Sequence, residues 1–213
     1  MRPVPPLLMR FKDRLRRIGP DQRGIAAVEF ALILPIMLAL FLGMSAVQPG
    51  YGIQRKIGVV ARTVADLSSR ADKITTVELK TIFGAAIAIM RPYDDTSTKQ
   101  YGLTQLVVSS VTVEKKGKDY IGKVKWSCPW NLVPASPGPG PAADDLKQRA
   151  KNSLVEVPEV FRNDATTSFI YVDALFPYTP NVGQVITGTL KLRKSYGWDV
   201  RDAKEVAEPG CPT

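Results

Sequence analysis

The chain has 213 residues and a formal net charge of +9, with 45% hydrophobic and 23% charged residues, which argues against wholesale disorder. It has no histidine and only two cysteines, Cys128 and Cys211. This composition excludes histidine-dependent triads, histidine-ligated zinc or haem, and four-cysteine metal centres. We therefore expect neither an enzyme nor a bound metal or cofactor.

The positive charge is concentrated at the N-terminus. Residues 1–24 hold seven basic and two acidic residues, a net charge of +5, whereas residues 25–213 carry only +4. Because a long apolar segment follows the basic run, the charge is better explained by membrane orientation than by nucleic-acid binding. We expect a basic cytoplasmic leader over residues 1–24 and no nucleic-acid partner.

Residues 25–48 are expected to form a transmembrane helix. Residues 25–47 contain one ionisable side chain, Glu29, and a helix of this length is about 34 Å long, enough for a ~30 Å hydrocarbon core. Pro35 should bend the helix, and Pro49 with Gly50 should stop it or form a hinge.

The distribution of basic residues predicts the orientation of this helix. Only Arg55, Lys56 and Arg62 follow it closely, so the positive-inside rule places the N-terminus in the cytoplasm and residues 48–213 outside. A secretory signal with a cleavage site at residues 43–45 is the alternative. It is disfavoured because the apolar stretch exceeds the usual 7–15 residues of such signals and contains an acid.

Glu29 is an unusual residue for a membrane helix. A carboxylate in the hydrocarbon region is costly, and such residues commonly have a function. In the alternative interpretation, Glu29 lies near the cytoplasmic end of the helix and its side chain reaches the aqueous interface.

The junction between leader and helix carries a family resemblance. Residues 22–32, QRGIAAVEFAL, resemble the amino end of the TadE-like family of tight-adherence (Flp-type) pilus assembly proteins. Those pseudopilins have a basic leader, a glycine, and a helix whose fifth residue is glutamate followed by an aromatic residue. The resemblance continues weakly over residues 54–57 and 62–67.

The resemblance implies that an aspartyl prepilin peptidase cuts between Gly24 and Ile25. It also implies that Glu29 and Phe30 act in assembly with other pilins or pseudopilins in the bacterial inner membrane. The chemistry is reasonable, because cleavage leaves an α-amine on Ile25 that a Glu29 carboxylate can pair with. Gly24 has no Cβ, which lets a protease approach the backbone closely.

Residues 49–91 are expected to form an extracytoplasmic helical region. The first helix, within residues 53–71, has apolar residues at helical spacing that form a core face or a face for a partner helix. A second helix should begin at Thr75 or Thr76 as N-cap and run to about Met90. The expected apolar positions are Ile53, Ile57, Val60, Ala61, Val64 and Leu67 in the first helix and Ile82, Phe83, Ala86, Ile87 and Met90 in the second.

Residues 92–213 are expected to form a small domain with an antiparallel sheet, so the fold class is α+β. Alternating β-branched residues predict one hairpin over residues 105–113 and 120–128, with Gly117 in its turn, and a second over residues 167–178 and 184–196. Residues 129–143 are rich in proline and predict a loop. Residues 144–152 should form one or two helical turns.

The remaining candidate sites are weaker. Cys128 and Cys211 would lie in an oxidising compartment and are expected to form a disulfide bond, two free thiols being the alternative. We interpret the acid pairs and a Lys–Ser pair as loop or strand residues rather than as catalytic groups. We interpret the tryptophans as core residues rather than as ligand-binding residues. These candidates are Asp94 and Asp95, Asp144 and Asp145, Lys194 and Ser195, and Trp126, Trp130 and Trp198.

Two functions fit these observations. The first is a structural pseudopilin of a tight-adherence pilus machine, anchored in the inner membrane with a periplasmic C-terminal domain. The alternative is an unprocessed single-pass extracytoplasmic binding or envelope adaptor protein. The state of the N-terminus in the mature protein distinguishes them.

Overall fold

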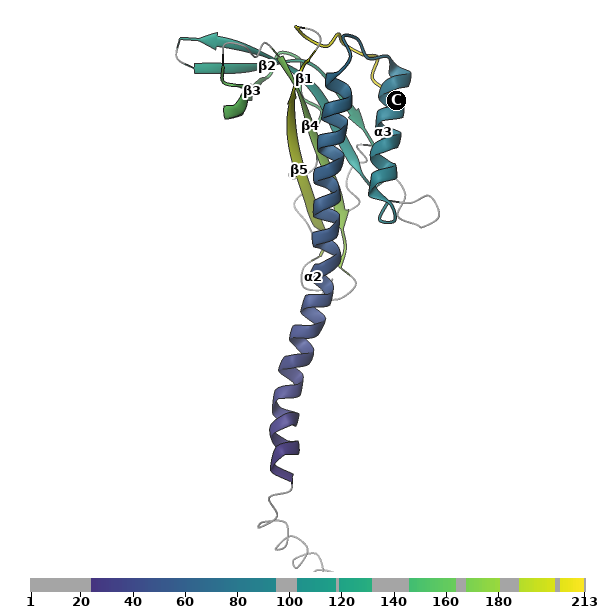
Figure 1. Ribbon diagram of the computed structural model, residues 1–213, viewed down its shortest axis with the longest axis vertical. Coiled ribbons are helices and arrows are strands. Elements are labelled where there is room, and N and C mark those ends of the chain that lie inside the picture. The colour runs from purple at the N-terminus through teal and green to yellow at the C-terminus, as the bar shows by residue number, and fades with distance from the viewer. Residues whose placement is uncertain are drawn as a thin grey trace, which may run out of the picture. The chain divides into compact units, whose positions relative to one another are not determined.

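The computed structural model describes residues 24–94, 103–117, 119–131, 146–163, 168–180, 188–201 and 204–212 (Figure 1). Two long helices and a five-stranded antiparallel sheet confirm the predicted α+β class. The chain divides after Ser45 into an N-terminal unit and a C-terminal unit, residues 46–213. The elements are α2 (Ile25–Ser69), α3 (Thr76–Met90), the 3-10 helix η3 (Glu159–Phe161), β1 (Gln105–Lys116), β2 (Asp119–Trp130), β3 (Leu154–Glu156), β4 (Ser168–Tyr178) and β5 (Leu190–Asp199).

The part of α2 that belongs to the N-terminal unit exposes its apolar side chains on every face. All residues from 25 to 45 are exposed, including Phe30, Leu40 and Phe41. The helix is long and apolar enough to cross a membrane. An apolar surface of this size requires lipid or other helices to cover it.

Pro49 and Gly50 were expected to stop the helix or to form a hinge. The stop is wrong, because α2 runs through both residues to Ser69, and the hinge stays a prediction. Proline removes one helical hydrogen bond, but the stripe that follows, from Ile53 to Val64, is fully buried and holds the helix in place. Gly50 allows close packing, since a Cβ there would lie 3.1 Å from Cε1 of Tyr178. The bend expected at Pro35 stays a prediction.

A capping box begins α3 and selects Thr75 from the two N-cap candidates. The Thr75 hydroxyl accepts a hydrogen bond from the Glu78 N–H (3.2 Å), and the Glu78 carboxylate accepts one from the Thr75 N–H (2.8 Å). The backbone bond first, then the bond to the Thr75 hydroxyl, lowers the pKa of Glu78. The helix ends at Met90 as predicted, and its buried face is Leu79, Phe83, Ala86 and Met90, with Ile82 and Ile87 half-buried.

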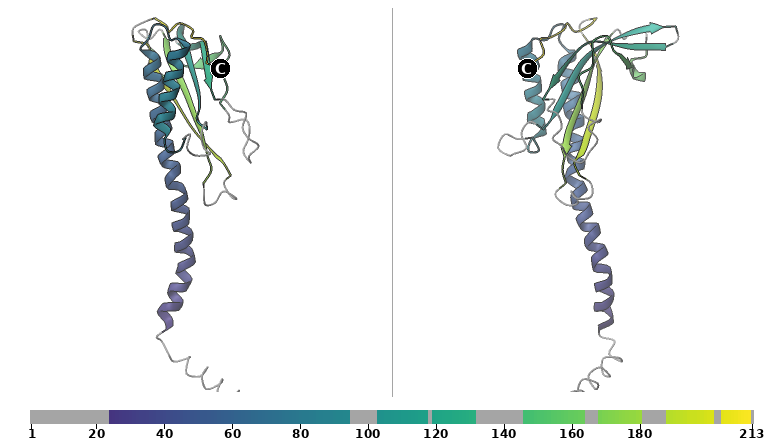
Figure 2. Two further views of the ribbon diagram at one scale, coloured as in Figure 1. Left: turned by 90° about the vertical axis from the view of Figure 1, so that its right-hand side faces the viewer. Right: turned by 180° about the vertical axis from the view of Figure 1, so that it is seen from behind.

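The strand order is β3-β2-β1-β4-β5, with every pair antiparallel. Both predicted hairpins are present, β1–β2 and β4–β5, and Gly117 has the positive φ expected of the first turn. One sheet face packs on α2 and α3 (Figure 2). A bulge after Ser110 turns the far end of β1–β2 toward η3, where a second small core includes Phe161 and Phe169.

A segment on the opposite sheet face differs from the helical turns predicted for residues 144–152. Residues 146–150 contain no helix and no other regular secondary structure, and Leu146 is buried against Val107 and Leu175. The chain then turns at Asn152, which has a positive φ, and enters β3. The proline-rich loop starts later than expected because β2 includes Pro129 and Trp130; residues 132–143 lie outside the described residues.

Candidate functional site

The predicted processing site lies where α2 begins. Ile25 is the first residue of the helix, and Gly24 immediately precedes it. A Cβ on Gly24 would meet no atom within 4 Å, and residues 24–30 are all exposed, with Phe30 60% exposed. The Gly24–Ile25 peptide bond is therefore open on the surface of the described chain.

Glu29 lies one helical turn after Ile25. Residues four apart share a face of a helix, and the rise between these two is about 6 Å along the axis. The first turn of α2 has no acidic residue, so Glu29 is the first carboxylate of the helix. Within the described part of the chain its side chain makes no hydrogen bond or ion pair, which leaves the carboxylate open to a group from another helix.

The structure does not assemble the weaker catalytic candidates into a site. Asp94 is buried and accepts a hydrogen bond from the Thr104 N–H at 2.8 Å; Asp95, Asp144 and Asp145 lie outside the described residues. Lys194 and Ser195 are neighbours on a strand, so their side chains point to opposite faces. The Ser195 hydroxyl donates to Asp173 instead.

The three tryptophans serve packing. Trp126 lies in the core and donates its Nε1–H to the Val206 carbonyl at 2.8 Å. The Trp130 ring lies 5.1 Å from that of Phe83, and Trp198 packs beside Tyr196. These contacts join the helices and the C-terminal segment to the sheet.

An ion cluster around Asp173 was not predicted. Asp173 lies in the middle of β4 with 1% of its side chain exposed, and its carboxylate binds Arg149 at 2.5 Å and Arg193 at 3.0 Å. The Arg149 guanidinium also stacks on Tyr171, 4.6 Å from the ring centroid. The cluster fastens the segment of residues 146–150 to the sheet. Its only sequence signal is an acid inside the apolar run FIYVDALF.

The C-terminal segment, residues 204–212, is fastened to the rest of the C-terminal unit at several points. Cys211 forms the expected disulfide bond with Cys128 of β2. The Ala207 N–H donates to the Asp72 carbonyl at 2.9 Å, in the connection between α2 and α3. The segment therefore joins the helical pair to the sheet.

Removing the disulfide bond should destabilise the C-terminal unit. The bond closes a loop with a sequence separation of 83, and a disulfide bond of this kind contributes about 2–5 kcal/mol. We expect Cys211→Ser in the detergent-solubilised full chain to lower Tm by at least about 5 °C. Thermal unfolding by circular dichroism measures this. An unchanged Tm, or thiols that react in the unreduced wild type, would contradict the prediction.

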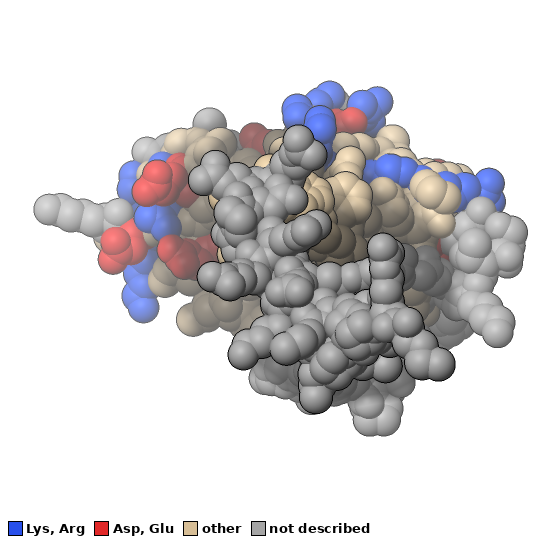
Figure 3. Space-filling view, turned by 90° about the horizontal axis from the view of Figure 1, so that it is seen from below, with Lys and Arg blue, Asp and Glu red and all other residues tan. Residues whose placement is uncertain are grey.

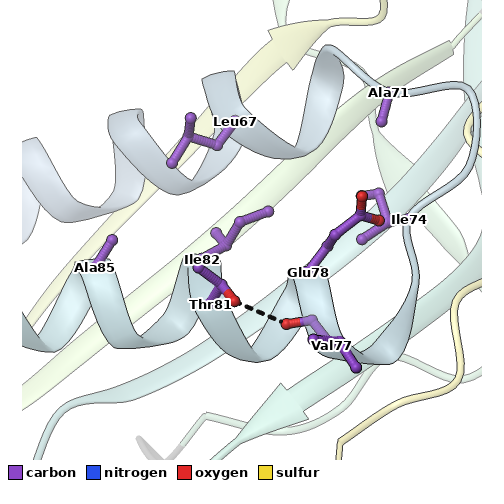
Figure 4. Close-up of a pocket in the computed structure, with 8 residues that line it drawn as sticks. All are labelled: Leu67, Ala71, Ile74, Val77, Glu78, Thr81, Ile82 and Ala85. Carbon is purple, nitrogen blue, oxygen red and sulfur yellow. Dashed lines mark hydrogen bonds between the residues drawn. The ribbon is translucent and has the colours of Figure 1, made fainter.

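An apolar hollow lies where the end of α2 meets the start of α3 (Figure 4). Leu67, Ile74 and Ile82 line it, and its polar atoms are already bonded: Thr81 Oγ1 donates to the Val77 carbonyl at 3.0 Å and Glu78 caps α3. Across the described ranges, no three acids or cysteines group as a metal site. The hollow thus supplies no reactive group.

Comparisons with known proteins concern the N-terminal segment alone. Comparisons with curated proteins and with solved structures give no match. A family model described as TadE-like protein matches residues 24–48, a range that begins at Gly24 and contains Glu29 and Phe30. The match supports involvement in tight-adherence pilus assembly. Residues 24–48 are thus similar to the TadE-like family, which confirms the resemblance predicted from the motif.

Proposed function

We propose that the protein is a pseudopilin-like structural component of a tight-adherence (Flp-type) pilus assembly machine, anchored in the bacterial inner membrane and processed after Gly24. The observation that carries the proposal is the TadE-like match, which begins at the glycine of the motif. The exposed Gly24–Ile25 bond at the start of a helix supports access by a prepilin peptidase.

The N-terminus faces the cytoplasm and the C-terminal unit faces the periplasm. Residues 1–24 carry a net charge of +5, and cytoplasmic flanks of membrane helices are the more basic ones. The disulfide bond between Cys128 and Cys211 supports the same assignment, because such bonds persist in the oxidising periplasm.

The partners are other pilins or pseudopilins, which bind through their membrane helices. Residues 25–45 of α2 are apolar and exposed on all faces, so when the helix is not covered by lipid it must be covered by other apolar helices. Glu29 gives this surface its single charge. The protein therefore acts by assembly, with no reaction of its own.

Processing is tested by the mass of the mature chain in cells that contain the prepilin peptidase. The wild type should begin at Ile25, and Gly24→Leu should keep its leader because the peptidase can no longer approach the backbone. Gly43→Leu is the matched control, since Gly43 is equally open on the same helix and should be processed normally.

Two results would contradict this proposal. A wild-type chain that keeps its leader would favour the unprocessed envelope adaptor. A mature chain that begins near residue 45 would favour a secretory signal.

A further inference from the structure

The C-terminal unit has a distinct end at which α2 enters, here called the entry end. Its described residues are 48–56, 91–94, 103–105, 130–131, 176–180 and 188–191. The strand ends meet there, because Tyr178 of β4 pairs with Leu190 of β5. The end of α3 meets α2 there, because Lys56 donates a hydrogen bond to the Arg91 carbonyl.

Tyrosines surround α2 at the entry end. A Cβ on Gly50 would lie 3.1 Å from the Tyr178 ring, and one on Gly52 would lie 3.1 Å from the Tyr93 hydroxyl. Glycine inside a helix lowers stability by about 0.5–1 kcal/mol relative to alanine. At Gly50 and Gly52 the missing Cβ lets the two tyrosine side chains approach the α2 backbone closely. Tyr51, between them, is 66% exposed.

The entry end is also positively charged. Its described residues include four bases, Arg55, Lys56, Arg91 and Lys191, and one acid, Asp94, which is buried. In the view from below, Asp and Glu at the left are mixed with Lys and Arg, whereas Lys and Arg predominate at the top and right (Figure 3). Tyrosine together with Lys and Arg is the composition of protein surfaces at membrane interfaces.

Helix geometry sets the distance of the entry end from the hydrocarbon region. Val47 is the last apolar residue of the expected span, and α2 continues from it without a linker. Tyr51 lies about 6 Å and Arg55 about 12 Å further along the axis. The headgroup layer is ~5–8 Å thick on each side of the hydrocarbon core, so the entry end begins within it.

We propose that the entry end is a docking surface for anionic phospholipid headgroups, which fixes the C-terminal unit against the bilayer. Tyr51 lies at the level of the headgroups, and Tyr93 and Tyr178 pack against α2 beside it. The bases begin further along the axis, and their long side chains extend back toward the phosphates. Leu190, 41% exposed at the tip of β5, reaches the same layer. The inference rests on the membrane span of the proposed function.

Quenching of a fluorophore by lipid tests the proposal on the full chain in vesicles. Met44→Cys, Leu190→Cys and Val160→Cys are each labelled with bimane without reductant, so that the native disulfide bond stays closed. The vesicles contain phosphatidylglycerol, or phosphatidylcholine, brominated near the glycerol end of the acyl chains. Met44 reports the span itself, and Leu190 reports the entry end.

Val160 is the matched control for Leu190. It is 78% exposed and precedes Phe161, whose ring stacks on Phe169 at the opposite end of β4 from Tyr178. Nine residues of strand separate Phe169 from Tyr178, about 30 Å. We expect the labels at positions 44 and 190 to be quenched on phosphatidylglycerol and the label at 160 to stay bright.

Charge is tested with Arg55→Gln, which removes an exposed base of the entry end, in the chain labelled at position 190. One basic residue at an anionic surface changes the docking equilibrium about fivefold, so quenching should fall on phosphatidylglycerol. Lys80→Gln, an exposed base of α3 that lies outside the entry end, should have no effect.

Each other outcome overturns part of the proposal. A quenched label at 44 with an unquenched label at 190 would disprove docking but keep the span. No quenching at 44 would disprove the span and the docking together. Equal quenching at 190 on both lipids would disprove the role of the four bases.

Discussion

Asp173→Ala is expected to destabilise the C-terminal unit by about 3–5 kcal/mol, a large part of the 5–15 kcal/mol that stabilises a typical domain. Asp173 is almost fully buried, and its carboxylate is the partner of both Arg149 and Arg193. Removing the carboxylate leaves the Arg149 guanidinium, only 18% exposed, without its counter-charge. Denaturant unfolding of the full chain in detergent, followed by tryptophan fluorescence, measures the loss.

The two arginines should respond differently to substitution. Arg149→Ala removes both the buried ion pair and the stacking on Tyr171, so its cost should approach that of Asp173→Ala. Arg193 is 48% exposed, and solvent screens its interaction, so Arg193→Ala should cost about 1 kcal/mol or less. Equal costs at the two positions would contradict the assignment of Arg149 as the principal partner.

Asp199 is a control for Asp173, because it is an acid on the neighbouring strand. Arginines stabilise the charged form of Asp173, whereas the surroundings of Asp199 disfavour its charged form. Partial burial raises the pKa of Asp199, and a bond from the Val200 backbone opposes this only in part. The charged form is therefore unfavourable in the folded state, and protonation relieves this cost as the pH falls through the folded-state pKa. Asp199→Asn should leave stability unchanged or increase it near pH 7. Asp173→Ala with the same stability as Asp199→Asn would contradict the role of the cluster.

Local signals predicted the helices and hairpins well. The Thr75–Glu78 capping box and the end of α3 at Met90 depend on residues close in sequence, so they are readable without the fold. The stripe from Ile53 to Val64 is likewise a local pattern, and the structure shows it as core. Alternation predicted both hairpins, although β1, β2 and β5 extend beyond their predicted ends. The last strand was expected from residue 184, but β5 begins at Leu190.

Features that depend on distant contacts were not predictable. The run through Pro49 and Gly50 depends on packing against Tyr178, which is far away in the sequence. The segment of residues 146–150 and β3 are held by β2 and by the Asp173 cluster rather than by their own propensities. A buried acid requires a partner, but the sequence does not show which arginine provides it.

The candidate site is more readily predicted from the sequence than these distant contacts, because it is a linear motif. Gly24, Ile25, Glu29 and Phe30 follow one another at the start of one helix, so the motif needs no tertiary contact to be recognised. The structure adds that all four are exposed. Under the proposed function the partner of Glu29 lies in another molecule, so its identity depends on assembly.

Glu29→Gln is expected to weaken association with pilin partners about tenfold or more while leaving membrane insertion and processing intact. Under the proposed function, the peptidase should require mainly the glycine and the junction between leader and helix, whereas the carboxylate should meet the α-amine that cleavage creates. A charge-assisted hydrogen bond contributes about 1.5–3 kcal/mol, which corresponds to about tenfold or more in affinity. Reduced solvation at the membrane edge strengthens the interaction. Co-purification with tagged pilins from detergent extracts measures the association, and intact mass measures processing.

Glu29→Asp separates charge from shape in the same assay. It keeps the carboxylate on the same face of α2, about 6 Å along the axis from Ile25, and should retain most of the association. Gln keeps the size and hydrogen-bonding capacity of Glu but loses the charge, so a role in packing alone would favour Gln over Asp. If Glu29→Gln is processed and co-purifies with the partners as the wild type does, Glu29 has no part in assembly. Its side chain then only reaches the aqueous interface, and the exposed apolar surface of α2 alone must hold the partners together.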